Sequence, residues 1–144
     1  MKSNNLSQFR LIFSADSTTD DYMNLAVSVD GQSKFGPAVC DKRLVVEFES
    51  TLPCQIQIDV SGKNYLNTQI DENGNIVKDT YIRLDSVFID RMPIKKWFLE
   101  SKFLKFYTEN QTLTSNYFGF NGRAVVDISY ADSFTYLLSL QESQ

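Results

Sequence analysis

Histidine is absent from this 144-residue chain. Because histidine is the general base of Ser-His-Asp and Cys-His sites, nucleophilic enzymes of both kinds are excluded. The His-Glu-x-x-His metalloprotease motif and most transition-metal sites are excluded for the same reason. What stays open is carboxylate chemistry, the binding of hard cations, or a function without catalysis.

Positive charge is scarce as well, with 14 Lys and Arg against 18 Asp and Glu and a net charge of -4. Nonspecific nucleic-acid binding needs a basic surface, so we expect no nucleic-acid partner. The chain also lacks the long apolar run of a transmembrane helix. Its N-terminus is polar and has no apolar signal-peptide core, so we expect a cytoplasmic or virion-associated protein with no membrane partner.

Cysteine occurs only twice, as Cys40 and Cys54. Two cysteines without histidine cannot form a structural zinc site of the usual type. In a chain without a predicted leader we expect two free, partly buried thiols. The alternative is a disulfide that closes the segment between them, which would contribute about 3 kcal/mol through loop entropy.

Alternation of polar and apolar residues is what the chain has in abundance. Every second side chain of Gln55–Val60 is apolar, and Leu44–Glu49 is nearly as regular. A period of two places apolar side chains on one face of a strand and polar ones on the other. Aromatic residues, which pack well on strands, make up 13% of the chain. The pattern predicts antiparallel sheets with one dry and one wet face.

Such segments recur at intervals of about ten residues, as in β-sandwiches and barrels. We expect a single all-β domain over residues 7–144, an antiparallel two-sheet β-sandwich of jelly-roll type, after a disordered tail over 1–6. A closed barrel is the alternative. Residues 94–100 fit a short helix or loop, in which Trp97 fills the core or an edge. The expected strands are residues 8–15, 22–30, 43–49, 54–60, 65–70, 80–90, 101–108, 113–120, 123–130 and 134–140, and residues 76–79 lead into the strand over 80–90.

Turn signals punctuate these strands. Asp30-Gly31 predicts a tight turn and Ser33–Pro37 a loop. The connection Ser50–Pro53 is short enough for a hairpin, and Asn121-Gly122 predicts a two-residue hairpin with a type I′ turn. In the segment that follows Thr80, the apolar phase slips near Ser86, which indicates a β-bulge or a strand that contacts two layers.

Acidic loops form one candidate site. Asp16, Asp20 and Asp21 lie together after the first expected strand, and Asp71–Asn75 forms a second acidic turn. Carboxylate and amide oxygens in loops are the ligands that Ca²⁺ requires, so we predict Asp16, Asp20 and Asp21 as metal ligands. Asp71–Asn75 departs from the EF-hand pattern because its glycine stands fourth instead of sixth. Solvated turns are the alternative for both loops.

An aromatic and amide cluster, Asn116–Arg123, forms the second candidate site. If Phe118 and Phe120 are buried, Tyr117 faces outward. An exposed ring with neighbouring amides and a guanidinium is how proteins hold sugars, because the ring stacks and the polar groups bind hydroxyls. Packing across a hairpin is the alternative. The predicted ligand residues are Tyr117, Asn116, Asn121 and Arg123, with Tyr65 and Tyr22.

Three strand-end segments carry a resemblance: Val27–Gly31, Asn73–Thr80 and Phe120–Gly122. With the strand pattern around them, the chain resembles jelly-roll modules of the carbohydrate-binding kind and small β-sandwich proteins of tailed phages. The resemblance extends over most of the chain but rests on turns. It implies glycan binding through exposed aromatic rings, often with Ca²⁺, and it assigns no individual residue.

Three functions follow from these observations. The leading hypothesis is a non-catalytic module that binds a carbohydrate or a partner protein. The second is a structural or assembly protein of a virion or another homo-oligomer, with exposed aromatic side chains in its interface. The third is a carboxylate-dependent glycoside hydrolase. Glu47 and Glu49 share an outward face about 7 Å apart, with Asp59 expected on the adjacent strand.

Overall fold

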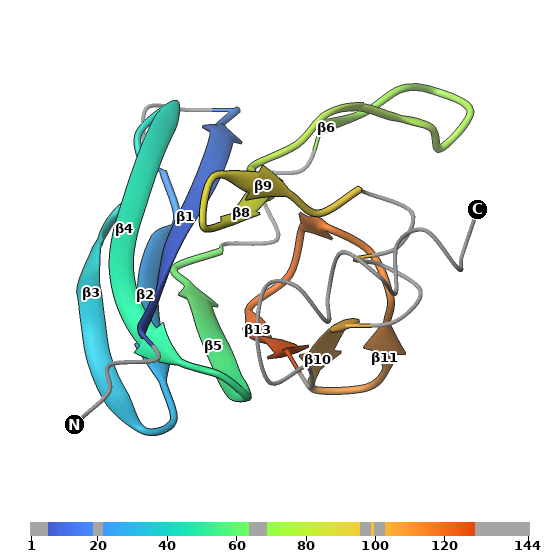
Figure 1. Ribbon diagram of the computed structural model, residues 1–144. Helices are drawn as coiled ribbons and strands as arrows, with labels where there is room; N and C mark the ends of the chain where they lie inside the picture. The colour runs from blue at the N-terminus through green and yellow to red at the C-terminus, as the bar shows by residue number, and fades with distance from the viewer. Residues whose placement is uncertain (1–5, 19–21, 64–68, 96–98, 100–102, 129–144) are drawn as a thin grey trace, which may run out of the picture.

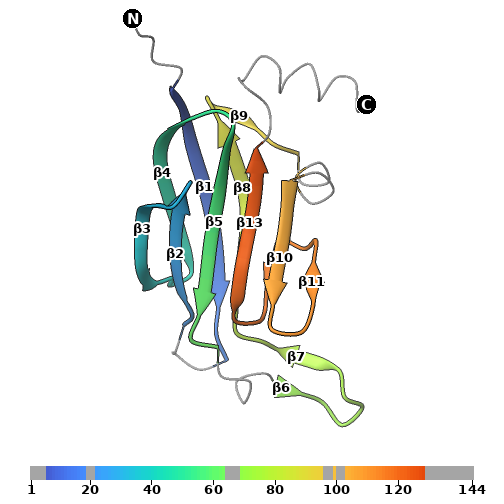
Figure 2. The same cartoon turned by 90° about the horizontal axis from the view of Figure 1, so that it is seen from below.

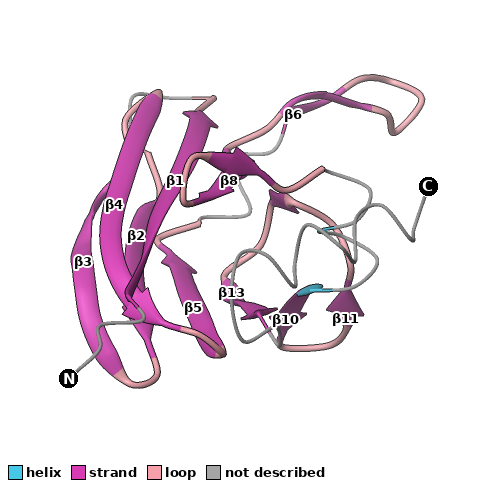
Figure 3. Ribbon diagram, viewed as in Figure 1, coloured by secondary structure: helices cyan, strands magenta, loops and turns pink. Residues whose placement is uncertain are grey.

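A computed structural model describes residues 6–18, 22–63, 69–95, 99 and 103–128 of the chain. Strands make up nearly all of its regular structure (Figure 3). They form two antiparallel sheets packed face to face, with a two-stranded ribbon beside them (Figure 1). This confirms the predicted all-β two-sheet sandwich of jelly-roll type. Tyr65, Asp20, Asp21, Trp97 and the expected strand 134–140 lie outside the described residues.

The five-stranded sheet has the strand order β12-β8-β1-β4, with β9 paired to β8. Its register is continuous between β1 and β4, and it shifts once between β1 and β8. At that shift Ile12 faces Ser86 and Phe13 faces Leu84, so Asp85 is the extra residue. The bulge predicted near Ser86 is confirmed. The strands are β1 (Leu6–Asp16), β4 (Arg43–Thr51), β8 (Tyr81–Ile89), β9 (Met92–Pro93) and β12 (Tyr117–Phe118).

The six-stranded sheet has the order β11-β10-β13-β5-β2-β3 and lies in front of the five-stranded sheet in Figure 2. The ribbon formed by β6 and β7 projects from one end of the sandwich. The strands of the sheet are β2 (Asn24–Val29), β3 (Gln32–Val39), β5 (Cys54–Ser61), β10 (Leu104–Thr108), β11 (Thr112–Leu113) and β13 (Gly122–Ile128), and those of the ribbon are β6 (Gln69–Ile70) and β7 (Ile76–Lys78).

The core lies between the two sheets and is filled by the apolar side of each alternating strand. In β5 the buried residues Ile56, Ile58 and Val60 alternate with polar residues, as predicted. The two layers meet at Phe106 of β10 and Phe118 of β12, whose ring centroids are 4.7 Å apart. Rings at this separation and tilt add attraction beyond the area that they bury.

Two predicted hairpins are wrong for one reason. β4 and β5 belong to different sheets, and so do β12 and β13. Each connection is an arch that carries the chain from one layer to the other. The alternation of polar and apolar residues is the same for strands joined by an arch and for strands joined by a hairpin. In both, the apolar sides of the two strands face one core, so the pattern does not distinguish the two connections.

Gly122 shows why the turn signal misled. The residues with positive φ do not include Asn121 or Gly122, as a type I′ turn would require. A Cβ on Gly122 would lie 2.3 Å from the backbone oxygen of Tyr107. Glycine therefore stands here because β13 and β10 approach closely.

Other local expectations are also settled. Asp30 and Gly31 have φ of 48° and 84° and form the predicted tight turn between β2 and β3. The predicted loop at Ser33–Pro37 is wrong, because this segment is part of β3. As an edge strand, β3 tolerates proline. In the region expected to be a short helix, the Leu99 backbone N–H donates to the Lys95 carbonyl at 2.9 Å, which is the spacing of one helical turn.

Both cysteines are free and buried, in agreement with the first expectation for them. Burial raises the thiol pKa of Cys40 to about 11, and nearby Asp41 adds to the shift. For Cys54, burial likewise raises the pKa to about 11. A thiol is reactive only when ionised, so both are inert packing residues at neutral pH.

Candidate functional site

The predicted ligand residues around Asn121 lie on two different surfaces. Tyr117 belongs to β12 at the edge of the five-stranded sheet, whereas Arg123 belongs to β13 inside the six-stranded sheet. The arch between these strands separates side chains that stand six positions apart in the sequence. The single site expected from the sequence therefore becomes two candidate surfaces.

The first surface, the Tyr117 cluster, consists of Lys63, Asp79, Tyr81 and Tyr117. The Tyr117 ring stacks on that of Tyr81 with centroids 4.6 Å apart, and its hydroxyl donates to Asp79 Oδ2 at 2.7 Å. Asp79 also forms an ion pair with the Lys63 ammonium. Burial, followed by the bond to Asp79, raises the pKa of Tyr117 well above its ordinary value.

Lys63 holds this cluster to the body of the protein. Its side chain is only 1% exposed, and its Nζ also donates to the Thr80 carbonyl at 2.5 Å. The Thr80 hydroxyl accepts the Thr18 backbone N–H at 3.1 Å, which ties the loop after β1 to the same place. A buried ammonium needs such partners, because an unpaired buried charge is very costly.

The amides of Asn116 and Asn121 bind backbone groups. Asn116 is 6% exposed and donates from Nδ2 to the Leu84 carbonyl at 2.9 Å. The Asn121 side chain accepts the Lys63 N–H at 2.7 Å and donates to the Lys63 carbonyl at 3.2 Å. Both amides fasten the strand ends that carry the Tyr117 cluster, and each amide makes at least one bond to the backbone.

The second surface, the sheet-face platform, is the outer side of β5, β13 and β10. Alternation directs one residue in two away from the core on each strand, so the platform collects side chains from all three. In their registers Tyr107, Arg123 and Asp59 form one row, and Lys105, Val125 and Gln57 the next. Its residues are Gln55, Gln57, Asp59, Lys105, Tyr107, Arg123, Val125 and Asp127.

The platform is open and shallow. Tyr107 is 43% exposed, and the Arg123 Nε donates to Asp59 Oδ1 at 2.7 Å. This bond raises the pKa of Arg123. Beside Tyr107 lies a depression of about 190 Å³, lined by Gln55, Phe103, Lys105, Tyr107, Val125 and Asp127. Amide, ammonium and carboxylate side chains line this depression together with Val125, Phe103 and the exposed ring of Tyr107. Arg123 lies opposite Tyr107 on the paired strand, so polar groups and one ring share this surface.

Tyr107 is the residue that sequence reasoning passed over. Its signal was present, because in the expected strand 101–108 it alternates with buried Phe106. The strand neighbours that make it a site could not be read from the sequence. Arg123 lies opposite Tyr107 only because β13 pairs with β10, and Asp59 lies opposite Arg123 only because β5 pairs with β13.

The predicted metal ligands are only partly described. Asp16 is exposed at the end of β1 and accepts the Ser17 backbone N–H at 2.8 Å. Tyr22, which was predicted to bind a sugar, is half-buried near the start of β2. Within the described ranges, no group of three or more His, Cys, Asp or Glu side chains could hold a metal ion. In the acidic turn, Asp71 accepts the N–H groups of Asn73 and Asn75. The bond from Asn75 is the main cause that lowers its pKa.

The carboxylates considered for hydrolysis do not lie together. Glu47 and Glu49 are on β4, whose strand partner is β1, whereas Asp59 is on β5 in the other sheet. The expectation that Asp59 lies on the strand adjacent to Glu47 is wrong. Glu47 instead approaches Arg10 at 3.9 Å, and Asp59 binds Arg123.

No family model and no curated protein sequence matches this chain. Two solved structures are similar in fold. One is the selenomethionine form of vCBM60, from work on calcium-dependent carbohydrate-binding modules, with a TM-score of 0.53 and 9% identity over 84% of this chain and 90% of the other. The second is vCBM60 in complex with galactobiose, with a TM-score of 0.51 and 10% identity over 83% and 97%. At this identity the likeness shows the β-sandwich fold.

Proposed function

We propose that this protein is a carbohydrate-binding module whose ligand lies on the sheet-face platform. The observation that carries the proposal is the row of Tyr107, Arg123 and Asp59 across three paired strands. A sugar ring would stack on Tyr107, while Arg123 and the amides beside it bind hydroxyl groups. The fold that the chain shares with vCBM60, which was solved with galactobiose, supports the same ligand class.

The platform suits a ligand better than the Tyr117 cluster does. Most polar groups of that cluster already bind one another or the backbone, and one face of the Tyr117 ring is covered by Tyr81. Along the platform, Lys105, Tyr107, Arg123 and Asp127 are exposed. The donors and acceptors of these side chains that bind only water can exchange it for sugar hydroxyls, and the Arg123 Nε stays bound to Asp59.

Calcium has no assigned place in this proposal. The described residues offer no cluster of donors that fits the ion, although vCBM60 comes from work on calcium-dependent modules. Asp16, Asp20 and Asp21 stay a prediction from the sequence. Binding measured in calcium and again in EDTA would show whether that loop takes part.

The test is glycan-array screening of the purified protein, with galactobiose included, followed by calorimetry on any ligand found. Tyr107→Ala should weaken binding about tenfold, because loss of a stacked ring costs about 1 kcal/mol or more. Tyr117→Ala is the matched control and should leave affinity within roughly twofold.

Either of two results would overturn the proposal. Binding to no glycan on a broad array would reject the ligand class. Loss of binding in Tyr117→Ala but not in Tyr107→Ala would move the site to the Tyr117 cluster, provided that circular dichroism shows both variants folded.

A further inference from the structure

The outer edge of β4 lacks a strand partner among the described residues. β4 is the last strand in the order of the five-stranded sheet and pairs with β1 along its whole length without a register shift. A long, regular edge presents a row of backbone N–H and C=O groups to solvent, which is a template for another strand.

The other sheet edges are protected by devices that β4 lacks. β3 contains Gly36-Pro37, and its register against β2 shifts twice. β11 and β12 are only two residues long. β4 extends over nine residues and contains neither proline nor glycine. Short length, proline and bulges discourage pairing between edges, so β4 is the edge open to addition of a strand.

The backbone groups that face this open edge can be identified. The Ala15 N–H donates to the Lys42 carbonyl at 2.7 Å across the β1–β4 pair. Since bonding residues alternate in an antiparallel pair, Leu44, Val46 and Phe48 bind β1. The N–H and C=O groups of Arg43, Val45, Glu47 and Glu49 therefore point away from the sheet.

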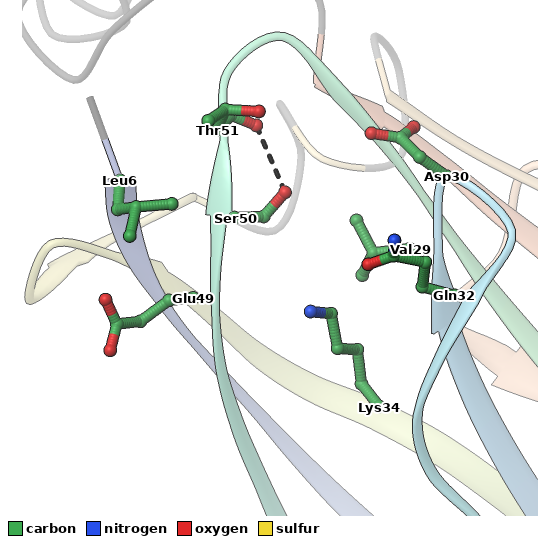
Figure 4. A pocket seen from close by; sticks show the side chains of 8 residues that line it. All are labelled: Leu6, Val29, Asp30, Gln32, Lys34, Glu49, Ser50 and Thr51. Carbon is green, nitrogen blue, oxygen red and sulfur yellow. Dashed lines mark hydrogen bonds between the residues drawn. The ribbon is translucent and has the colours of Figure 1, made fainter. Parts of the chain in front are cut away.

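The surface around this edge is hollowed and incompletely buried. A depression of about 310 Å³, drawn in Figure 4, is lined by Lys34 of β3 and by Glu49, Ser50 and Thr51 of β4. A second of about 510 Å³ includes Glu47, Phe48 and Glu49. Leu44 and Phe48 face the core but are only half-buried, because the sandwich ends here.

We infer that β4 pairs antiparallel with β4 of a second copy of this chain, about a two-fold axis at Val46. In this register Arg43 lies opposite Glu49 of the second copy, and the same pair recurs across the axis. Neither Arg43 nor Glu49 has an ion-pair partner among the described residues. Leu44 lies opposite Phe48 of the second copy, which covers both half-buried side chains.

Backbone geometry and charge select this register. The outward-pointing residues carry odd numbers, and a two-fold axis at Val46 pairs odd positions with odd positions over residues 43–49. Moving the axis to Glu47 keeps the hydrogen bonds but places two glutamates opposite each other, which is unfavourable. Moving it to Val45 shortens the pairing to residues 43–47. A closed two-fold dimer follows, and the sheet-face platform, which belongs to the other sheet, stays uncovered.

The first experiment is sedimentation velocity of the full chain from micromolar to millimolar concentration. We expect a dimer whose population rises with concentration. Arg43→Glu and Glu49→Arg should each weaken it by about tenfold or more, because two attractive pairs become repulsive. The double variant Arg43→Glu/Glu49→Arg should regain the dimer, since it restores opposite charges.

The matched control is Glu109→Arg, which makes the same change of charge between β10 and β11, at the far edge of the other sheet. It should dimerise like the wild type. A wild-type monomer at every concentration, an assembly larger than a dimer, or single variants that dimerise like the wild type would each overturn the inference. A double variant that stays monomeric, with an unchanged thermal transition, would do so as well.

Discussion

The Tyr117 cluster and the sheet-face platform are built from the same kinds of group but lie in opposite environments. Each brings a tyrosine near a carboxylate and a cation. In the cluster the side chains of Lys63 and Asp79 are 1% and 11% exposed, whereas those of Arg123 and Asp59 in the platform are 54% and 42% exposed. The cluster is closed on itself, and the platform is open to solvent.

This difference separates a structural role from a binding role. A buried ion pair leaves a costly unpaired charge when one partner is lost, so it stabilises the arrangement in which it is complete. An exposed pair contributes little to folding because water and salt screen it. We therefore expect substitutions in the cluster to act on stability, and substitutions in the platform to act on binding.

The largest expected effect is that of Lys63→Ala. Removing the ammonium leaves the largely buried Asp79 without its cation, which should lower the free energy of unfolding by about 3 kcal/mol. Urea denaturation would measure the loss. A loss below about 1 kcal/mol would mean that the Lys63–Asp79 pair contributes no more than an exposed ion pair, and the cluster would then not differ from the platform in its effect on stability.

Gly122→Ala should have the second largest effect on stability. The new methyl group would lie too close to the Tyr107 backbone oxygen, so β13 and β10 must move apart. A loss of about 1–3 kcal/mol is expected, as for other overpacked sites. Because the strands of the platform are displaced, glycan binding should fall too. Gly74→Ala is the comparison for backbone strain without a clash: that turn has open space, but its φ of 84° disfavours alanine, so stability should fall while glycan binding stays unchanged.

Tyr117→Phe removes one hydrogen bond and keeps the stacked ring. We expect a loss of about 1 kcal/mol, at the low end for a bond to a charged group because Tyr117 is 37% exposed. Burial, followed by the bond to Asp79, raises the folded-state pKa of Tyr117 above its ordinary value of 10.0. The protonated hydroxyl therefore keeps its bond to Asp79 below pH 10.0, and the stability linked to that proton is lost as pH rises through the folded value. The stability difference from the wild type should be constant near neutral pH and narrow in alkaline solution. A stability difference that stays constant into alkaline solution would show that it does not depend on the protonated Tyr117 hydroxyl.

Arg123→Ala should have the smallest effect on folding, below about 1 kcal/mol. The same substitution should weaken glycan binding, because the guanidinium is one of the platform's exposed donors. Paired denaturation and calorimetry on one preparation would measure both quantities. A large loss of stability with unchanged binding would reverse the roles assigned to the two regions.

The sequence predicted more of the fold than of the candidate site. The inward faces of β1, β2 and β5, the bulge near Ser86 and the turn at Asp30-Gly31 were all predicted. Each depends on residues close together in the chain. The two false hairpins and the overlooked β3 depend on which strands pair, and no local pattern specifies that choice.

In the candidate site, too, local features were predicted and features that depend on strand pairing were not. The sequence indicated an outward-facing Tyr117 on the condition that Phe118 and Phe120 are buried. Tyr117 and Arg123 are exposed and Phe118 is buried, but Phe120 is 39% exposed, so half of that condition is wrong. The sequence could not indicate that Tyr117 binds Asp79, or that Arg123 lies between Tyr107 and Asp59. Alternation is a property of each strand and follows from backbone geometry, so the sequence by itself determined which side of each strand is dry. Which strands became neighbours, and hence which outward side chains share a surface, was decided only when both layers buried their apolar sides against each other.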